Sequence, residues 1–151
     1  MKKVLSTLEM YKKSMLLFSA LLFSVSVLAQ PSNNNCSGAT VIASNVSCVN
    51  TAATINGATA STGMPAGCAS GGTHYDVWFK FTAFGSSHTV TISSLQANFT
   101  NPEIQLYSGN NCNNLTSVAC GTTTITSTTL TGGNTYYVRV SNVGASVSTN
   151  G

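Results

Sequence analysis

The stretch YDVWFKFT, residues 75–82, decides the fold class. Val77, Phe79 and Phe81 alternate with polar or charged neighbours at a period of two residues, which is the pattern of a half-buried β-strand. One face of this strand is therefore expected to lie in the core. The other face either points to solvent or carries Trp78 into a second set of contacts.

Weaker stretches with the same character lie on both sides of this strand. They predict further strands at residues 40–43, 52–60, 88–93, 103–107, 122–130 and 135–143. The last two are joined by the turn Thr131-Gly132-Gly133-Asn134 and are expected to form a hairpin. Seven or eight short strands with polar turns and no helical period predict an all-β, antiparallel, jelly-roll-like β-sandwich.

The start of the chain has the form of a bacterial secretory signal. Lysines precede an apolar run over residues 15–28, and Ala29 then places a small side chain before Gln30. The run is shorter than the roughly 20 residues that a membrane-spanning helix needs, so no stable membrane anchor is expected. We expect cleavage between Ala29 and Gln30, and a mature chain that is secreted or held at the cell surface. This predicts a signal peptide at 1–29, a short polar linker at 30–35 and one domain at 36–151.

Removal of the signal peptide would leave a chain without net charge. Lys80 and Arg139 remain against Asp76 and Glu103, so the sum is 2 − 2 = 0, although the full chain has a formal net charge of +3. A chain of this kind has no basic patch that could displace counterions from a phosphate backbone, which excludes nucleic acid as a natural partner.

All five cysteines follow the predicted cleavage site, in a chain bound for an oxidising compartment that favours disulfides. We expect Cys112 to pair with Cys120, because these two bracket a short polar loop. A hairpin of residues 40–46 with 52–61 would place Cys36 near Cys68 and leave Cys48 at the turn. An odd cysteine remains in any pairing, so either an intermolecular bond or a partner outside the chain is expected.

Few side chains of the mature chain could support catalysis. His74 and Asp76, two residues apart on a strand, are the best acid–base or metal suggestion. The stronger interpretation is that Asp76 accepts structural hydrogen bonds and that His74 lies in a loop. Asp76 and Glu103 are weak calcium candidates, because calcium needs six to eight oxygen ligands. The cysteine and histidine spacings do not suit zinc, so no metal, cofactor or enzyme activity is expected.

Three aromatic residues, Trp78, Tyr107 and Tyr137, suggest a possible ligand platform. Carbohydrate-binding β-sandwiches stack such side chains on sugar rings, and Tyr and Trp combine an apolar ring with a polar tip. If Trp78 and Tyr137 point to the outer face of one sheet, they form a platform for glycans. If they cover the sheet edge or meet a strand beyond the chain end, no platform exists. Packing in a core explains most of the aromatic residues equally well.

An ordered set of short motifs covers nearly all of residues 35–143. The motifs are Cys36-Ser37-Gly38-Ala39, Gly67-Cys68, Asp76-Val77-Trp78-Phe79-Lys80-Phe81, Ile104-Gln105-Leu106-Tyr107-Ser108-Gly109, Val118-Ala119-Cys120 and Leu130-Thr131-Gly132-Gly133-Asn134-Thr135-Tyr136-Tyr137-Val138-Arg139-Val140. Their order resembles bacterial pre-peptidase C-terminal-like domains, in the versions carried by surface or secreted proteins of the type IX secretion system. The resemblance implies a jelly-roll sandwich that serves as an accessory or adhesion module.

The resemblance also implies a closing strand with an aromatic residue and a cysteine, which lies beyond Gly151. It therefore predicts a domain truncated at its C-terminus, with the partner of Cys48 beyond the chain end. The implied function is a non-catalytic extracellular accessory or adhesion module of a larger protein, with neighbouring domains as partners and surface glycans or proteins as further ones. The alternative is a carbohydrate-binding module or a substrate-binding domain attached to a hydrolase or peptidase.

Overall fold

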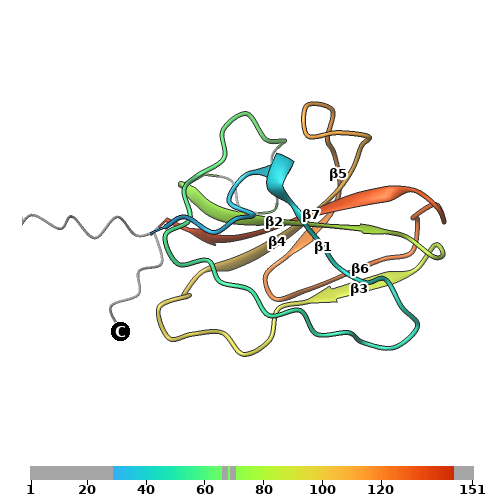
Figure 1. Ribbon diagram of the computed structural model, residues 1–151, viewed down its shortest axis with the longest axis horizontal. Coiled ribbons are helices and arrows are strands. Elements are labelled where there is room, and N and C mark those ends of the chain that lie inside the picture. Colours follow the sequence, from blue (N-terminus) through green and yellow to red (C-terminus); the bar gives the residue numbers. More distant parts are fainter. Residues whose placement is uncertain (1–28, 66–67, 69–70, 145–151) are drawn as a thin grey trace, which may run out of the picture.

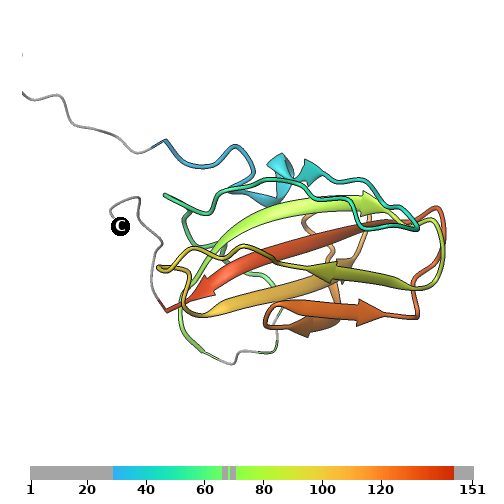
Figure 2. The same cartoon turned by 90° about the horizontal axis from the view of Figure 1, so that it is seen from below.

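Two β-sheets pack face to face in the structure, a computed structural model that describes residues 29–65, 68 and 71–144. Figures 1 and 2 show the larger sheet with a short two-stranded sheet against one of its faces. The predicted all-β sandwich is confirmed. The predicted signal peptide lies outside the described residues except for Ala29. Within the described ranges, no helix has the length and apolar character needed to cross a membrane.

The described chain forms one 3₁₀ turn and seven strands. In chain order these are η1 (Cys36–Gly38), β1 (Thr40–Val41), β2 (His74–Thr82), β3 (His88–Thr91), β4 (Pro102–Ser108), β5 (Thr116–Gly121), β6 (Thr124–Ser127) and β7 (Thr135–Val143). The five-stranded sheet has the order β1-β2-β7-β4-β5, and β3 pairs with β6. β1 runs parallel to β2, and the other pairs are antiparallel.

Alternation along the central strands gives the five-stranded sheet two buried faces. The inner face packs against the short sheet and forms the main core, which includes Val77, Phe79, Phe81, Ile104, Leu106, Ile125 and Val138. The outer face carries a second apolar cluster of Cys36, Ala39, Trp78, Tyr107 and Tyr137. The outer face of β2 therefore does not point to solvent at Trp78, but carries this residue into a second set of contacts.

The predicted hairpin of residues 122–130 with 135–143 is wrong. β6 pairs with β3 in the short sheet, whereas β7 lies between β2 and β4 in the other sheet. The Gly-Gly turn between them crosses from one sheet to the other, and both Gly133 N and Asn134 O bond to the backbone of Ala83. Turn residues mark a chain reversal, but they do not say whether the flanking strands pair.

The predicted hairpin of residues 40–46 with 52–61 is also wrong. β1 is two residues long and pairs with β2, and the segment 52–60 contributes one isolated bridge, from Ala60 to Tyr75. Residues 51–54 are exposed, so their small side chains bury no apolar surface that would hold a strand in place. β5, in contrast, lies where a loop was predicted.

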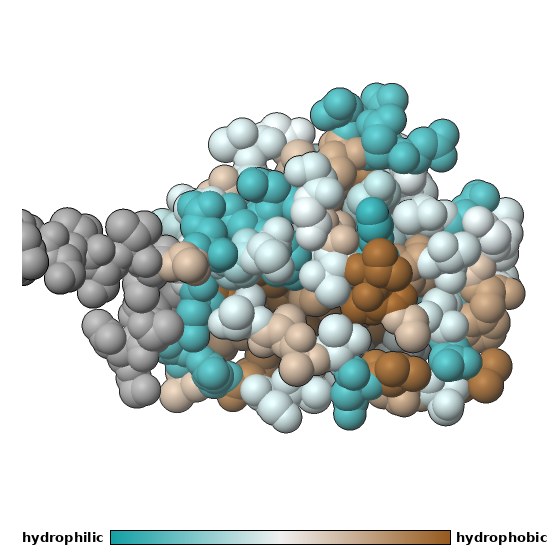
Figure 3. Space-filling view, viewed as in Figure 1, coloured by the Kyte–Doolittle hydropathy of each residue, from teal (hydrophilic) through white to brown (hydrophobic). Residues whose placement is uncertain are grey.

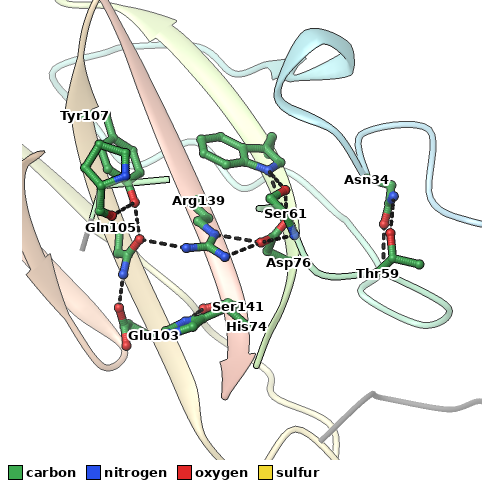
Figure 4. Close-up of polar contacts among 12 residues, drawn as sticks. Asn34, Thr59, Ser61, His74, Asp76, Glu103, Gln105, Tyr107, Arg139 and Ser141 are labelled. Carbon is green, nitrogen blue, oxygen red and sulfur yellow. Dashed lines mark hydrogen bonds and ion pairs between the residues drawn. The ribbon is translucent and has the colours of Figure 1, made fainter. Parts of the chain in front are cut away.

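The polar segment 30–35 belongs to the domain and is not a linker. Asn33 and Asn34 are buried. Asn33 bonds the backbone of Trp78 in both directions, through Trp78 N to Asn33 O at 2.8 Å and through its own Nδ2 to Trp78 O at 2.9 Å. Asn34 joins Thr59 through its amide nitrogen and oxygen, at 2.8 and 2.7 Å (Figure 4). These bonds hold the N-terminal segment along β2.

Candidate functional site

The predicted aromatic platform exists as a cluster, but its central residues Trp78 and Tyr107 are closed to ligands. Trp78, Tyr107 and Tyr137 come from three adjacent strands, and the Trp78 and Tyr107 rings stack with centroids 5.8 Å apart. Trp78 and Tyr107 are 0% exposed and Tyr137 is 7% exposed. Cys36, Ala39 and neighbouring loop residues pack over them. A sugar ring cannot stack on covered faces, so the prediction of a Trp78 platform is wrong.

Beside this cluster, Asp76 is the centre of a buried ion pair (Figure 4). Its Oδ2 accepts from Arg139, at 2.5 Å from Nη2 and 2.7 Å from Nε. Its Oδ1 accepts from Ser61 Oγ at 2.7 Å and from Trp78 Nε1 at 3.0 Å. Because all these bonds surround a carboxylate that is 0% exposed, Asp76 cannot reach a substrate. The prediction that Asp76 accepts structural hydrogen bonds is confirmed.

The hydrogen-bonded chain continues from Arg139 onto β4. Arg139 Nη1 donates to Gln105 Oε1 at 3.2 Å, and Gln105 Nε2 donates to Glu103 Oε1. The Tyr107 hydroxyl donates to Gln105 Oε1 and, at 3.2 Å, to Pro65 O. Burial raises the pKa of Tyr107 above its ordinary value of 10.0, and Arg139 opposes this change only in part. The phenol therefore stays protonated and acts as a donor.

The structure does not join His74 to Asp76 as an acid–base pair. His74 is the first residue of β2 and not a loop residue, and its Nδ1 lies 3.3 Å from Ser141 Oγ. The second histidine, His88, lies 2.8 Å from Ser44 Oγ through its Nε2. The calcium candidate Glu103 is buried and bonds Gln105. In the described part of the chain, no three His, Cys, Asp or Glu side chains are grouped so that they could hold a metal ion.

Both predicted cysteine pairings are wrong. Cys36 pairs with Cys112, and Cys68 pairs with Cys120, with Cα atoms 5.8 and 5.6 Å apart. The pairing of Cys112 with Cys120 fails because β5 intervenes, and an extended strand moves the chain about 3.3 Å per residue, whereas a disulfide needs Cα atoms within about 7 Å. Cys48 is a free, exposed thiol. One disulfide attaches η1 to the loop between β4 and β5, and the other attaches the loop before β2 to the edge strand β5.

Openings on the surface of the sandwich include a larger and a smaller cleft. We name the larger one, of about 950 Å³, the side cleft; it lies between residues 42–56, β3 and residues 93–99, and its floor is the inner face of the five-stranded sheet. Figure 3 shows apolar side chains exposed on the face that carries residues 42–56. We name the smaller one, of about 430 Å³, the end cleft; it lies beside Lys80 between the turns at 108–110 and 133–135.

The described fold agrees with a comparison of the sequence with protein families. A galactose-binding domain-like family associated with type IX secretion has a profile that matches residues 32–150. The chain belongs to this family. The predicted link to type IX secretion is thus confirmed, while the narrower pre-peptidase C-terminal-like assignment stays a prediction. No curated protein and no solved structure matches the chain significantly.

Sequence reasoning missed the ion pair in this galactose-binding domain-like chain. Asp76 and Arg139 were treated as separate charges, although the chain after residue 29 has only two residues of each sign. A usable signal was present, because Arg139 stands between Val138 and Val140 in a strand and Asp76 precedes Val77 in another. Charges at such positions are rarely buried without a partner of opposite sign. Ser61 and Gln105, in contrast, carry no signal in the sequence.

Proposed function

We propose that this galactose-binding domain-like chain is a non-catalytic accessory module of a larger secreted or cell-surface protein. Two disulfides and the family's link to type IX secretion support an extracellular location. The side chains that could catalyse a reaction are used within the fold. Asp76 and Glu103 are buried, and both histidines lie within bonding distance of serine hydroxyls. This favours a role in binding or in stabilising a neighbouring domain over a role in catalysis.

The observation that carries the proposal is the rim of the side cleft. Five large apolar side chains of the described residues are exposed, and four of them line this cleft: Val46, Val49, Phe84 and Leu95. Exposed apolar groups gathered at one opening mark interaction surfaces. β3 also pairs on one edge only within the described residues, and the other edge faces the cleft. We infer that an uncharged, apolar part of a neighbouring domain packs here, because no Asp, Glu, Lys or Arg lines the cleft.

Cys48 provides a test, since its exposed thiol stands on the same rim. The purified mature chain and the protein recovered in place from the cell envelope would each be treated with a maleimide reagent. We expect modification of Cys48 to be at least ~10-fold slower in the envelope material, with full modification of both after denaturation and reduction. Equal rates would contradict the proposal. So would turnover of a peptide or glycoside by the mature chain that His74→Ala abolishes.

Carbohydrate binding is the second candidate function. It is favoured by the end cleft, which is open, lined by Asn, Ser, Thr and Lys side chains and separate from the side cleft. Sugar hydroxyls are bound by amide and hydroxyl groups of this kind. Screening of the mature chain on a glycan array would test this function independently of Cys48 modification.

A further inference from the structure

The end cleft is formed by segments that are far apart in the sequence. β2 contributes Lys80, β7 contributes Tyr137, and the turns after β4 and before β7 form the two walls. Lys80 and Tyr137 are direct partners across the β2–β7 ladder. The volume of about 430 Å³ lies within the usual range for small-ligand sites, roughly 300–1,000 Å³. The cleft is therefore large enough for one or two sugar units.

The walls of the end cleft are fixed by backbone bonds. Gly133 N donates to Ala83 O at 2.7 Å, and Asn134 O accepts from Ala83 N at 2.9 Å, which ties one turn to the end of β2. In the other turn, Gly109 has a φ of +152°, and a Cβ at this position would lie 2.3 Å from Asn114 O. Walls held in this way lose little conformational freedom when a ligand binds.

Lys80 gives the end cleft a positive charge, and no acidic side chain of the described residues lies close enough to neutralise it. The acids after residue 29 are Asp76 and Glu103, and both are buried beneath the loops on the outer face. Asp76 is already paired with Arg139. It also precedes Lys80 by four residues on β2, about 13 Å at the usual strand rise, which is too far for an ion pair. No acidic residue lines the cleft itself.

We propose that the end cleft binds a hexuronic-acid unit of an acidic glycan. The carboxylate bonds to the Lys80 ammonium, and the amides of Asn110 and Asn134 are placed on the walls to meet ring hydroxyls. A nucleic-acid phosphate backbone is not the ligand, because one uncompensated lysine cannot match a row of phosphates. This inference rests on the second candidate function, carbohydrate binding, and names its substrate class.

The test compares three ligands of similar size on the mature chain by calorimetry: an oligogalacturonate, its methyl ester and a neutral galacto-oligosaccharide. We expect the acid to bind at least ~10-fold more tightly than the ester. Lys80→Gln should lose this preference, and Lys80→Arg should retain it. Higher salt should weaken binding of the acid to the wild-type chain but not to Lys80→Gln. Thr128→Ser, at an exposed position outside both clefts, is the control and should bind like the wild type.

Each outcome decides a different point. Equal binding of acid and ester would overturn the uronate proposal while leaving carbohydrate binding intact. Binding of none of the array glycans would overturn both. Preference for a sulfated over a carboxylated sugar would overturn the carboxylate assignment. Backbone NMR shifts confined to residues 108–110 and 133–135 would support the location, provided that the Lys80→Gln spectrum shows the same fold, whereas shifts at the side cleft would contradict it.

Discussion

The two sides of this sandwich differ in how far they are covered and crosslinked. Around Trp78, the outer face of the five-stranded sheet is covered by loops, crossed by a charged hydrogen-bonded chain and crosslinked by both disulfides. The short sheet has a four-residue edge strand and no disulfide among the described residues. Segments beside it carry a free thiol and four exposed apolar side chains that line the side cleft. The comparison teaches that the charged and aromatic residues which look functional in the sequence, such as Asp76, Arg139 and Trp78, stabilise the fold. The two clefts, in contrast, are lined mostly by residues that carry no functional signal in the sequence.

Removal of one partner of the buried ion pair should lower the stability of the fold more than any other change proposed below. Arg139→Met leaves the Asp76 carboxylate without its cation in a site that is 0% exposed, and should lower the free energy of unfolding by about 4 kcal/mol. Urea unfolding followed by tryptophan fluorescence would measure it. Val46→Ser, on the open side, should change stability by less than about 0.5 kcal/mol.

Adding Asp76→Asn to Arg139→Met provides a further check. The double variant should recover part of the loss, since no buried charge then remains unpaired. A loss below about 1 kcal/mol for Arg139→Met alone would mean that the outer face is not sealed as described.

The disulfides should have the next largest effect. Replacing Cys36 and Cys112 together by Ala removes a crosslink that spans 76 residues, and should cost about 3 kcal/mol. Peptide mapping of the unreduced wild-type chain should yield the Cys36–Cys112 and Cys68–Cys120 fragments. Recovery of a Cys112–Cys120 fragment would refute the observed connectivity, and would mean that no disulfide holds η1 on the outer face.

The alternation of residues was enough to predict the sandwich and the faces of its central strands. Val77, Phe79 and Phe81 lie inward as predicted, because a period of two fixes which side chains share a face. Strand pairing was not predictable in the same way. The threonine-rich strand β6 pairs with β3, and nothing in the local composition distinguishes this from a hairpin with β7. The wrong Cys36–Cys68 pair followed from a wrong hairpin, and the wrong Cys112–Cys120 pair followed from the missed strand β5.

The candidate site was predicted in composition but not in burial. Trp78, Tyr107 and Tyr137 do gather on one face, as the platform hypothesis required. The sequence could not show that η1 and the loop before β2 cover them, since a short polar segment carries no signal of where it docks. Lys80 is one of few charges in the sequence. That both acids are buried away from it became evident only from the structure.

The smallest effect on stability should come from the ionisation of one group on the outer face, the Tyr107 hydroxyl. The folded state raises the pKa of Tyr107, so above pH 10 the unfolded chain releases this proton while the folded chain keeps it. Stability from this group is thus fully present below pH 10 and falls as pH rises towards the folded pKa, at no more than about 1.4 kcal/mol per pH unit.

Urea unfolding between pH 9 and 11, in a Cys48→Ser background that suppresses thiol exchange, would measure this slope. Tyr107→Phe should flatten the slope and cost about 1 kcal/mol at pH 7, through the lost hydrogen bonds to Gln105 and Pro65. Tyr75→Phe, which removes a half-buried hydroxyl outside this network, is the matched control and should keep the wild-type slope. If Tyr107→Phe also kept it, the Tyr107 hydroxyl would be open to water, and the outer face would be no better closed than the short sheet.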